Sequence, residues 1–402
     1  MLFFSKVIYN LGIRLYYAFI WIASFFNEKA KHFINGRKKK IEQTTGKVAW
    51  FHCASLGEFE QAVPLINLLK KKDSNYKIVL TFFSPSGYEV KKNTALADVV
   101  YYLPIDTKKN AKEWIKKINP NLVFFVKYEF WWHYLNELNK QEIPAYLVSS
   151  IFRKEQIFFK FYGHLFRKML EKFSHIFVQD DKSAQLLSSI SIKNTTIAFD
   201  TRFDQVKSNA INANKFPAIE NFINEKPCIV VGSSWLKDEI LFKELLSKLS
   251  HYKIIIAPHD INTQRLKELK TNFSKAIFYS EIEKHTNEQV LIIDNYGMLT
   301  SLYQYADIAY IGGAFGVSVH NVLEAAVYGV PLIFGANYHK SKEAIDLIKL
   351  KAAHTVKDSN SLFDSIQHFN DKRHRESAIK TTQSYIDTRL GGTTTIFSEI
   401  NL

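Results

Sequence analysis

The sequence predicts two consecutive α/β domains, each built around a doubly wound, Rossmann-like parallel sheet. Three observations support this fold class. Short, nearly continuous apolar runs alternate with helical stretches from about residue 47 onward, which is typical of parallel strands covered by helices on both faces. A polar, asparagine-rich stretch at about residues 206–226 divides this alternation into two series. The length of 402 residues also exceeds what a single hydrophobic core commonly supports.

The apolar runs are the predicted strands. In the first series they are residues 48–55, 77–83, 99–106, 122–129, 144–150, 175–179 and 195–199. In the second series they are residues 228–234, 253–259, 276–280, 290–294, 308–313 and 330–335. Ligands of such sheets bind beyond the carboxyl ends of the strands, so the loops that follow these runs are the expected sites.

The composition indicates an anionic partner. Lysine and arginine number 53 against 39 aspartates and glutamates, which gives a formal net charge of +14. We find no nucleic-acid-binding motif, so we expect anionic lipid or a phosphorylated substrate and no nucleic acid. Cys53 and Cys228 lie in apolar runs and are interpreted as buried hydrophobic residues. No cluster of histidine, cysteine and aspartate has metal-ligand spacing, so we expect no metal and no cofactor.

The N-terminal segment supports two interpretations. Residues 7–26 are apolar and aromatic over about 30 Å of helix, but Arg14 lies near the middle. A basic cluster follows within residues 29–40, of the kind that meets anionic lipid. We favour a membrane-attached helix and leave open whether it spans. The alternative is an ordinary amphipathic helix packed on its own domain.

Two glutamates follow apolar runs of the first series. Ser55 and Glu58 lie three residues apart at a strand-to-helix turn, which is a capping box and needs no catalytic role. The same position could make Glu58 a general base at the ligand-binding edge. A helix N-terminus lowers a carboxyl pKa and burial raises it, so both roles stay open. Glu129 ends another run, and either a structural pairing or a place in the site would explain it.

Two glycine-containing loops of the second series are candidates for phosphate binding. Gly-Ser-Ser at 232–234 and Gly-Gly at 312–313 follow apolar runs directly, and small residues let backbone N–H groups approach a phosphate. Asn321 and Glu324 follow the second loop and suit contacts to a nucleotide, with ordinary helix capping as the alternative. Neither loop matches a full dinucleotide or P-loop fingerprint.

In their order along the chain, these loops resemble those of the Kdo transferases (3-deoxy-D-manno-octulosonic acid transferases), inverting enzymes with the two-domain GT-B fold. The resemblance covers nearly the whole chain. Its motifs are Ser-Leu-Gly-Glu at 55–58, Tyr-Leu-Pro-Ile-Asp at 102–106, Glu129 with Trp131, Asp-Thr-Arg-Phe-Asp at 200–204, Gly-Ser-Ser at 232–234, Ala-Pro-His-Asp at 257–260, Tyr-Gly-Met at 296–298 and His-Asn-Val-Leu-Glu at 320–324.

The resemblance implies an activity and a set of site residues. It implies transfer of Kdo from CMP-Kdo to lipid IVA, the lipid A precursor, at the cytoplasmic face of the inner membrane, without a cofactor or metal. Glu58 would be the catalytic base, and Glu129 and Arg202 would stabilise charge in the transition state. The expected donor-binding residues are Ser233, Ser234, Pro258, His259, Tyr296, Gly297, Met298, Gly313, Asn321, Val322, Leu323 and Glu324.

The resemblance also implies a domain organisation. Residues 1–40 would be a membrane-associated helix with a basic segment, 41–210 the acceptor-binding domain and 211–402 the CMP-Kdo-binding domain, with a cleft between the two larger domains. 

The sequence departs from the family pattern at Lys127 and Met298, where the family has glutamates, and at His259, where it has an arginine. These changes predict altered donor contacts, because histidine lacks the fixed fork of arginine. Two rival functions are a UDP-sugar transferase or epimerase of the same fold, and a membrane-surface binding module without catalysis.

Overall fold

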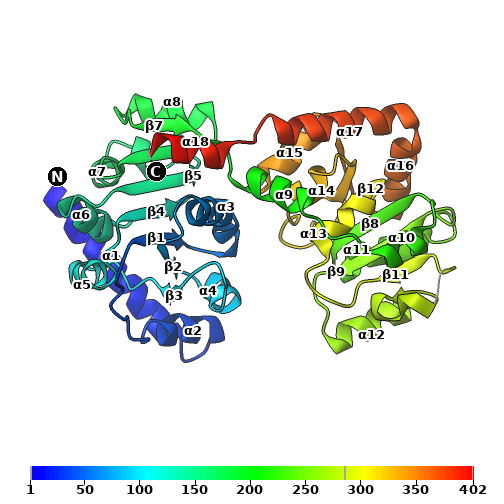
Figure 1. The fold of residues 1–402 in the computed structure, drawn as a ribbon, viewed down its shortest axis with the longest axis horizontal. Coiled ribbons are helices and arrows are strands. Elements are labelled where there is room, and N and C mark those ends of the chain that lie inside the picture. The colour runs from blue at the N-terminus through cyan, green and yellow to red at the C-terminus, as the bar shows by residue number, and fades with distance from the viewer. Residues whose placement is uncertain (1, 285–286, 401) are drawn as a thin grey trace. The chain divides into compact units, whose positions relative to one another are not determined.

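The computed structural model describes residues 2–284, 287–400 and 402. They form two compact units: unit 1 contains the chain up to Gln205 together with Leu390–Leu402, and unit 2 contains Val206–Arg389. Each unit is built on a seven-stranded parallel sheet with helices packed around it (Figure 1). The predicted fold class of two doubly wound α/β domains is therefore confirmed.

Unit 1 has the strand order β3-β2-β1-β4-β5-β6-β7. Its strands are β1 (Val48–Cys53), β2 (Lys77–Phe82), β3 (Val99–Tyr102), β4 (Leu122–Val126), β5 (Ala145–Ser150), β6 (His175–Val178) and β7 (Thr195–Ile197). Its helices are α1 (Leu2–Ala23), α2 (Glu28–Gly36), α3 (Leu56–Lys72), α4 (Pro85–Lys91), α5 (Lys108–Ile118), α6 (Trp132–Lys140), η1 (Ile157–Phe159), α7 (His164–Leu170), α8 (Asp181–Ser189) and α18 (Gly392–Glu399), and α9 (Arg202–Ile211) continues into unit 2. β1 and β4 are buried along their whole length, because helices cover both faces of the sheet.

Unit 2 has the strand order β10-β11-β9-β8-β12-β13-β14. Its strands are β8 (Cys228–Ser234), β9 (Lys253–Pro258), β10 (Ile277–Phe278), β11 (Val290–Ile292), β12 (Ile308–Ile311), β13 (Leu332–Gly335) and β14 (Ala353–Val356). Its helices are α10 (Pro217–Ile223), α11 (Leu236–Leu245), α12 (Thr263–Asn272), η2 (Tyr279–Lys284), α13 (Leu299–Leu302), η3 (Tyr303–Tyr305), α14 (Leu323–Ala326), α15 (Lys342–Lys349), α16 (Ser359–Asn370) and α17 (Lys372–Asp387). Every predicted strand is present. β14 was not predicted, because its sequence Ala-His-Thr-Val lacks an apolar run.

The strand orders place a topological switch point in each sheet. In unit 1 the chain reverses direction across the sheet between β1 and β4, and in unit 2 between β8 and β12. Crevices at the carboxyl ends of such strand pairs are where doubly wound sheets bind ligands. Of the loops singled out from the sequence, those at residues 55–58, 129 and 312–313 follow β1, β4 and β12, whereas Gly-Ser-Ser at 232–234 forms the end of β8 itself.

The end of the chain returns to unit 1, whereas the sequence resemblance predicts that all residues after 210 belong to the second domain. α18 lies with the elements of unit 1 (Figure 1), and its Ile396 and Phe397 are buried in a hydrophobic core of that unit. The Asp204 carboxylate accepts hydrogen bonds from the backbone N–H groups of Gly391 and Thr393, each at 2.7 Å. A short helix that joins a core by tertiary packing leaves no signal in the alternating pattern.

The N-terminal segment combines an anchored helix with an exposed apolar face. α1 contacts the rest of unit 1 through Tyr9 and Asn10. The Tyr9 hydroxyl donates to Asp106 at 2.6 Å, and the Asn10 side-chain oxygen lies 2.7 Å from His133 Nε2. None of its residues is fully buried. The large apolar side chains that it exposes are Phe3, Phe4, Val7, Ile8, Leu11, Leu15, Tyr16, Phe19, Trp21 and Ile22. Among the helices described, none is both long and apolar enough to cross a membrane.

α2 and the residue after it belong to the folded unit. Phe33 and Ile34 of α2 are buried. Arg37 donates to the carbonyl oxygens of Leu103 at 2.9 Å, Phe33 at 3.0 Å and Phe83 at 2.7 Å. The sequence groups these residues with a separate segment at 1–40, because the alternating pattern begins only after them. The structure instead makes them part of the cover over the ends of β2 and β3.

We therefore expect two N-terminal truncations to behave differently. Removal of residues 1–26 keeps α2 and its N-cap Asn27, so this variant should fold cooperatively, with a lower midpoint of urea denaturation than the full-length protein. Removal of residues 1–40 deletes Phe33, Ile34 and Arg37. Loss of one buried phenylalanine alone costs about 3–5 kcal/mol, so the longer truncation should not fold stably. Urea denaturation followed by circular dichroism measures both, and equal midpoints would contradict the role of α2.

Candidate functional site

The turn between β1 and α3 holds Glu58 in a buried position. Ser55 is the N-cap of α3 and Glu58 is the third residue of the helix. The Glu58 carboxylate accepts hydrogen bonds from the backbone N–H groups of Ala54 and Ser55, the latter at 3.2 Å. Only 9% of Glu58 is exposed. The capping contact expected from the sequence is present, and it fixes the carboxylate at the carboxyl end of β1.

Glu129 follows β4 and is held by two ring N–H donors. Its Oε2 accepts from His52 Nε2 and from Trp131 Nε1, each at 2.7 Å. His52 is fully buried on β1, and its Nδ1 lies 2.9 Å from the hydroxyl oxygen of Thr81 on β2. The imidazole therefore stands between two fixed partners and orients Glu129. His52 was not identified from the sequence, where it is one polar residue within an apolar run.

Glu58 and Glu129 share one edge of the sheet because β1 and β4 are hydrogen-bonded neighbours. Burial, together with the negative charge of Glu129, raises the pKa of Glu58 to about 7, against the opposing effects of its backbone hydrogen bonds and of Lys127. The sequence left open whether the helix N-terminus lowers the pKa of Glu58 or burial raises it. In the structure the effect of burial is the larger one. A carboxylate with this pKa is suited to accept a proton near neutral pH.

Arg202 is held by a buried carboxylate of the same unit. Its Nε donates to both oxygens of Asp200 at 3.1 Å, and its Nη2 donates to one of them at 2.8 Å. Asp200 also accepts hydrogen bonds from Gln61 of α3 at 2.9 Å and from Gln179 at 3.0 Å. Burial works to raise the pKa of Asp200, but the Arg202 guanidinium and these hydrogen bonds keep it below its usual value. Arg202 is thus positioned by a network that includes the helix carrying Glu58.

Unit 2 contains a cavity of about 640 Å³ at its own switch point, between the ends of β8 and β12. Its lining residues are Trp235, Leu236, Lys237, Asp238, Gly313, Phe315, Gly316, Val317, Ser318 and His320. Only Gly313 of this set belongs to the donor-binding residues expected from the sequence. Trp235, Asp238 and Phe315 were missed, although they flank the two small-residue loops that were singled out.

The backbone at Gly313 requires glycine. Its φ of 90° is left-handed, and a Cβ atom there would lie 2.6 Å from the His320 ring. The Gly313 N–H, expected to meet a phosphate, donates to the Asp238 carboxylate at 3.2 Å. The adjacent Asp238 side chain is buried and also accepts from Tyr310 at 2.8 Å. This carboxylate is therefore part of the frame of the loop.

Three aromatic rings gather beside this cavity. His259 stacks on Trp235 with ring centroids 4.7 Å apart and on His320 with centroids 4.6 Å apart. Trp235 Nε1 donates to His320 Nε2 at 3.1 Å, so that nitrogen is an acceptor. Burial, with the neighbouring His259, lowers the pKa of His320 to about 4. His259 stands where the Kdo transferase pattern has an arginine, so this chain presents a stacked imidazole ring there in place of a guanidinium.

The remaining expected donor residues fall into two groups. Pro258 directly precedes His259 in the chain, and Asn321, Val322 and Leu323 directly follow His320. Ser233 takes a left-handed conformation at the end of β8 with φ of 50°. Ser234 is engaged, because its hydroxyl donates to the buried Glu239 at 2.7 Å. Glu324 accepts from Asn321 at 3.1 Å and borders Thr300 and Tyr328 instead of the cavity. In the other loop Tyr296 is exposed, Gly297 has a φ of 90° and Met298 is buried.

Within the residues that the structure describes, no group of three or more histidine, cysteine, aspartate or glutamate side chains could hold a metal ion. The expectation of a reaction without a metal or cofactor stays a prediction.

The comparisons with known proteins agree with the resemblance seen in the sequence. Residues 27–205 match the family model described as 3-Deoxy-D-manno-octulosonic-acid transferase (kdotransferase). The chain is 26% identical to the 3-deoxy-D-manno-octulosonic acid transferase of Chlamydia trachomatis, over 94% of each chain. It is 26% identical to the enzyme of that name from Aquifex aeolicus, over 79% of this chain and 83% of the other. The resemblance to the Kdo transferases is confirmed.

One further relative is a longer protein than this chain. A bifunctional glycosyltransferase/methyltransferase of Fusobacterium nucleatum is 25% identical over 89% of this chain, which spans 58% of that protein. Among solved structures, the UDP-GlcNAc 2-epimerase of Neisseria meningitidis matches with a TM-score of 0.61 and 14% identity, over 88% of this chain and 99% of that one. At this identity the match shows a shared GT-B-like fold alone.

The geometry around Glu58 predicts an observable titration. In carboxyl ¹³C NMR of the folded protein, Glu58 should titrate near pH 7, protonated below and ionised above. Glu129→Gln removes a like charge and should move this titration to lower pH. Glu60, whose pKa burial also raises and Lys91 lowers, is the internal control and should be unchanged by that substitution. Titration of Glu58 near 4.5, the ordinary value, would contradict the burial argument.

Proposed function

We propose that the protein transfers Kdo from CMP-Kdo to lipid IVA during lipopolysaccharide biosynthesis. The kinship with Kdo transferases supports Kdo as the transferred sugar. The observation that carries the proposal is the buried Glu58 carboxyl beside Glu129 at the switch point of unit 1, with its pKa raised to about 7. The excess of 14 positive charges suits a nucleotide-sugar donor and a phosphorylated acceptor.

The proposed reaction is a direct, inverting displacement at the anomeric carbon of Kdo. Glu58 accepts the proton of the acceptor's 6-hydroxyl on the distal glucosamine as that oxygen forms the new glycosidic bond. The bond from the anomeric carbon to the CMP phosphate breaks, and CMP leaves with the electron pair. Two fixed N–H donors orient Glu129, and Asp200 orients Arg202, so neither group must be ordered during the reaction.

The donor is proposed to bind unit 2 at the cavity beside Gly313. The rings of Trp235, His259 and His320 offer a stacking surface for a nucleobase, which would replace the arginine contact of the family pattern. His320 is neutral at physiological pH because burial lowers its pKa to about 4, so it supplies no charge to the phosphate.

We also propose attachment to the cytoplasmic face of the inner membrane through α1. Its exposed apolar side chains include Phe4, Ile8, Leu15 and Phe19, while Tyr9 ties the opposite side of the helix to unit 1. A helix of this kind lies in the interface with its apolar face in lipid. The exposed basic residues of the following segment, Lys29, Lys31, Lys38, Lys39 and Lys40, would meet anionic headgroups.

A UDP-sugar enzyme is the main alternative, because the fold is shared with UDP-GlcNAc 2-epimerases. Nucleotide binding separates the two functions. Calorimetry should detect CMP binding and weaker UMP or UDP binding. The resemblance expects Glu324 at the nucleotide, although in the structure it borders Thr300 and Tyr328 outside the cavity, so this expectation is tested separately. Glu324→Gln should weaken CMP binding by about 1–3 kcal/mol if the carboxylate accepts ribose hydroxyl hydrogens. Preferential binding of UDP would contradict the donor assignment, and unchanged CMP affinity would remove Glu324 from the site.

The decisive test of the proposed reaction is Glu58→Gln. Glutamine keeps the size of the side chain and its oxygen can still accept the capping hydrogen bonds. We expect a melting temperature and CMP affinity close to the parent, with single-turnover Kdo transfer to lipid IVA slower by about 10²–10⁴-fold. Mass spectrometry of the product from the parent identifies the transferred sugar. Transfer within about tenfold of the parent would make Glu58 a structural cap only. Absence of transfer by the parent would favour the binding-module alternative.

A further inference from the structure

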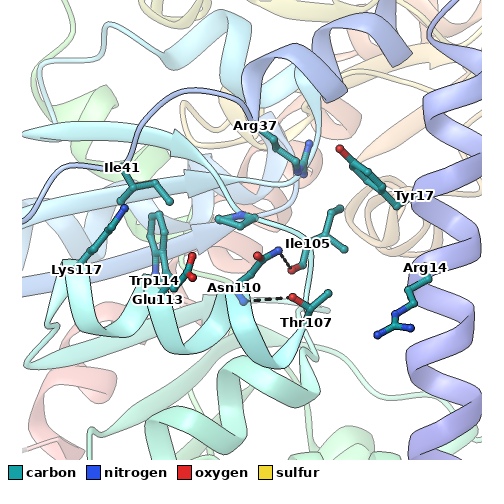
Figure 2. Close-up of a pocket in the computed structure, with 11 residues that line it drawn as sticks. Arg14, Tyr17, Arg37, Ile41, Ile105, Thr107, Asn110, Glu113, Trp114 and Lys117 are labelled. Carbon is teal, nitrogen blue, oxygen red and sulfur yellow. Dashed lines mark hydrogen bonds between the residues drawn. The ribbon is translucent and has the colours of Figure 1, made fainter.

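Unit 1 contains a second cavity, of about 480 Å³, bounded by α1, the segment after α2 and α5 (Figure 2). It lies next to the ends of β2 and β3, and Arg37 binds the carbonyl oxygens of Phe83 and Leu103, the residues that directly follow these strands. The polar residues that line it are Arg14, Tyr17, Arg37, Thr107, Asn110, Glu113 and Lys117. We call it the basic cavity. The reaction proposed above uses none of these side chains.

Arg37 is a largely buried cation without a carboxylate partner among the described residues. Its three hydrogen bonds go to backbone carbonyl oxygens, and its guanidinium carbon lies 3.5 Å from the centre of the Phe33 ring. Burial lowers the pKa of Arg37 to about 10. A guanidinium has five N–H donors, so three bonds leave two donors over. Buried charges are normally paired, and an anion in the cavity would complete this one.

The neighbouring side chains add to the positive potential of the basic cavity. Arg14 and Lys117 also form no ion pair within the described part of the chain. Tyr17, one turn after Arg14 on α1, points its hydroxyl toward Arg37 (Figure 2). The single lining carboxylate, Glu113, is 57% exposed and lies 4.0 Å from Lys109. The cavity therefore presents three cations and a hydroxyl against one solvated anion.

The shape and the wall of the basic cavity indicate what kind of anion it takes. Its lining runs along α5 from Thr107 to Lys117, a helical distance of about 15 Å, which is longer than a lone phosphate. One wall is α1, whose opposite side exposes Phe4, Ile8 and Phe19. A molecule with a phosphate in the cavity and hydrocarbon along α1 would use both features. A free nucleotide or inorganic anion would use only the cavity and not the apolar side of α1.

We propose that the basic cavity binds the phosphate-bearing headgroup of a membrane lipid, with Arg14, Tyr17 and Arg37 around the phosphate. This inference rests on the proposed membrane attachment of α1 and is independent of Kdo transfer. Bound lipid would lie between α1 and the rest of unit 1 and would hold the helix in place. The cavity would therefore make attachment through α1 specific for anionic lipid, beyond the general attraction of basic residues to a charged surface.

The test measures lipid binding without a membrane surface. Dihexanoyl phosphatidic acid, used below its micelle concentration, is titrated into the full-length protein by calorimetry at 0.15 M salt, where loose charge attraction is screened. It should bind at least about tenfold more tightly than dihexanoyl phosphatidylcholine. Arg14→Gln and Tyr17→Phe should each weaken its binding by about fivefold or more. Lys112→Gln on α5 carries the same charge change as Arg14→Gln but lies outside the cavity, and it should leave binding unchanged.

Three results would overturn the inference. Equal binding of the two lipids would show that the phosphate is not recognised, and equal losses for Arg14→Gln and Lys112→Gln would show only general charge attraction. Inorganic phosphate binding as tightly as the lipid would make the cavity a site for a free anion. Neither the titrations with lipid nor the titration with inorganic phosphate involves CMP-Kdo. Failure of Kdo transfer with intact lipid binding would therefore count against the proposed function alone.

Discussion

The hydrogen-bonded pairing of β1 with β4 is the constraint on which the candidate active site depends. Glu58 and Glu129 are far apart in the chain, and this pairing brings the ends of their strands to one edge of the sheet. His52, on β1, then reaches Glu129 at 2.7 Å, so one strand supplies both the buried partner of Glu129 and the turn that holds Glu58. A shift of register between β1 and β4 would separate all three groups, because side chains alternate between faces.

Burial decides the chemistry of Glu58. The helix N-terminus and two backbone N–H groups favour its ionised form, and a solvated glutamate in that place would be a weak base. The low polarity of the site and the charge of Glu129 act in the opposite direction, and together they raise the pKa to about 7. The capping and base roles are thus compatible: the cap fixes the position of the carboxyl, and burial sets its proton affinity.

The parts of this structure that are local in sequence could be predicted, and the parts that depend on distant contacts could not. Strand runs and the Ser-x-x-Glu turn at 55–58 carry their own signal, and both are present. Asp106 was identified as part of a motif, but its partner Tyr9 lies 97 residues away and no local pattern links them. The same holds for His52 with Glu129, 77 residues apart, and for α18, which joins unit 1 from the end of the chain. The order of the motifs indicated the resemblance to the Kdo transferases, while these pairings could be found only in the folded structure.

Asp106 connects the N-terminal helix to the loop that carries Glu129 in the candidate site. Besides the Tyr9 hydroxyl, its buried carboxylate accepts the backbone N–H groups of His133 and Tyr134, each at 3.1 Å, and so caps α6 just after Glu129. The Trp132 N–H in turn donates to the Tyr9 oxygen at 3.3 Å. Burial raises the pKa of Asp106 to about 6, and its hydrogen bonds oppose that rise. Since one carboxylate is shared by α1 and by the start of α6, a displacement of α1 would strain the segment that carries Glu129. The helix that we propose to lie on lipid is therefore mechanically linked to the group that we propose to act in the transition state.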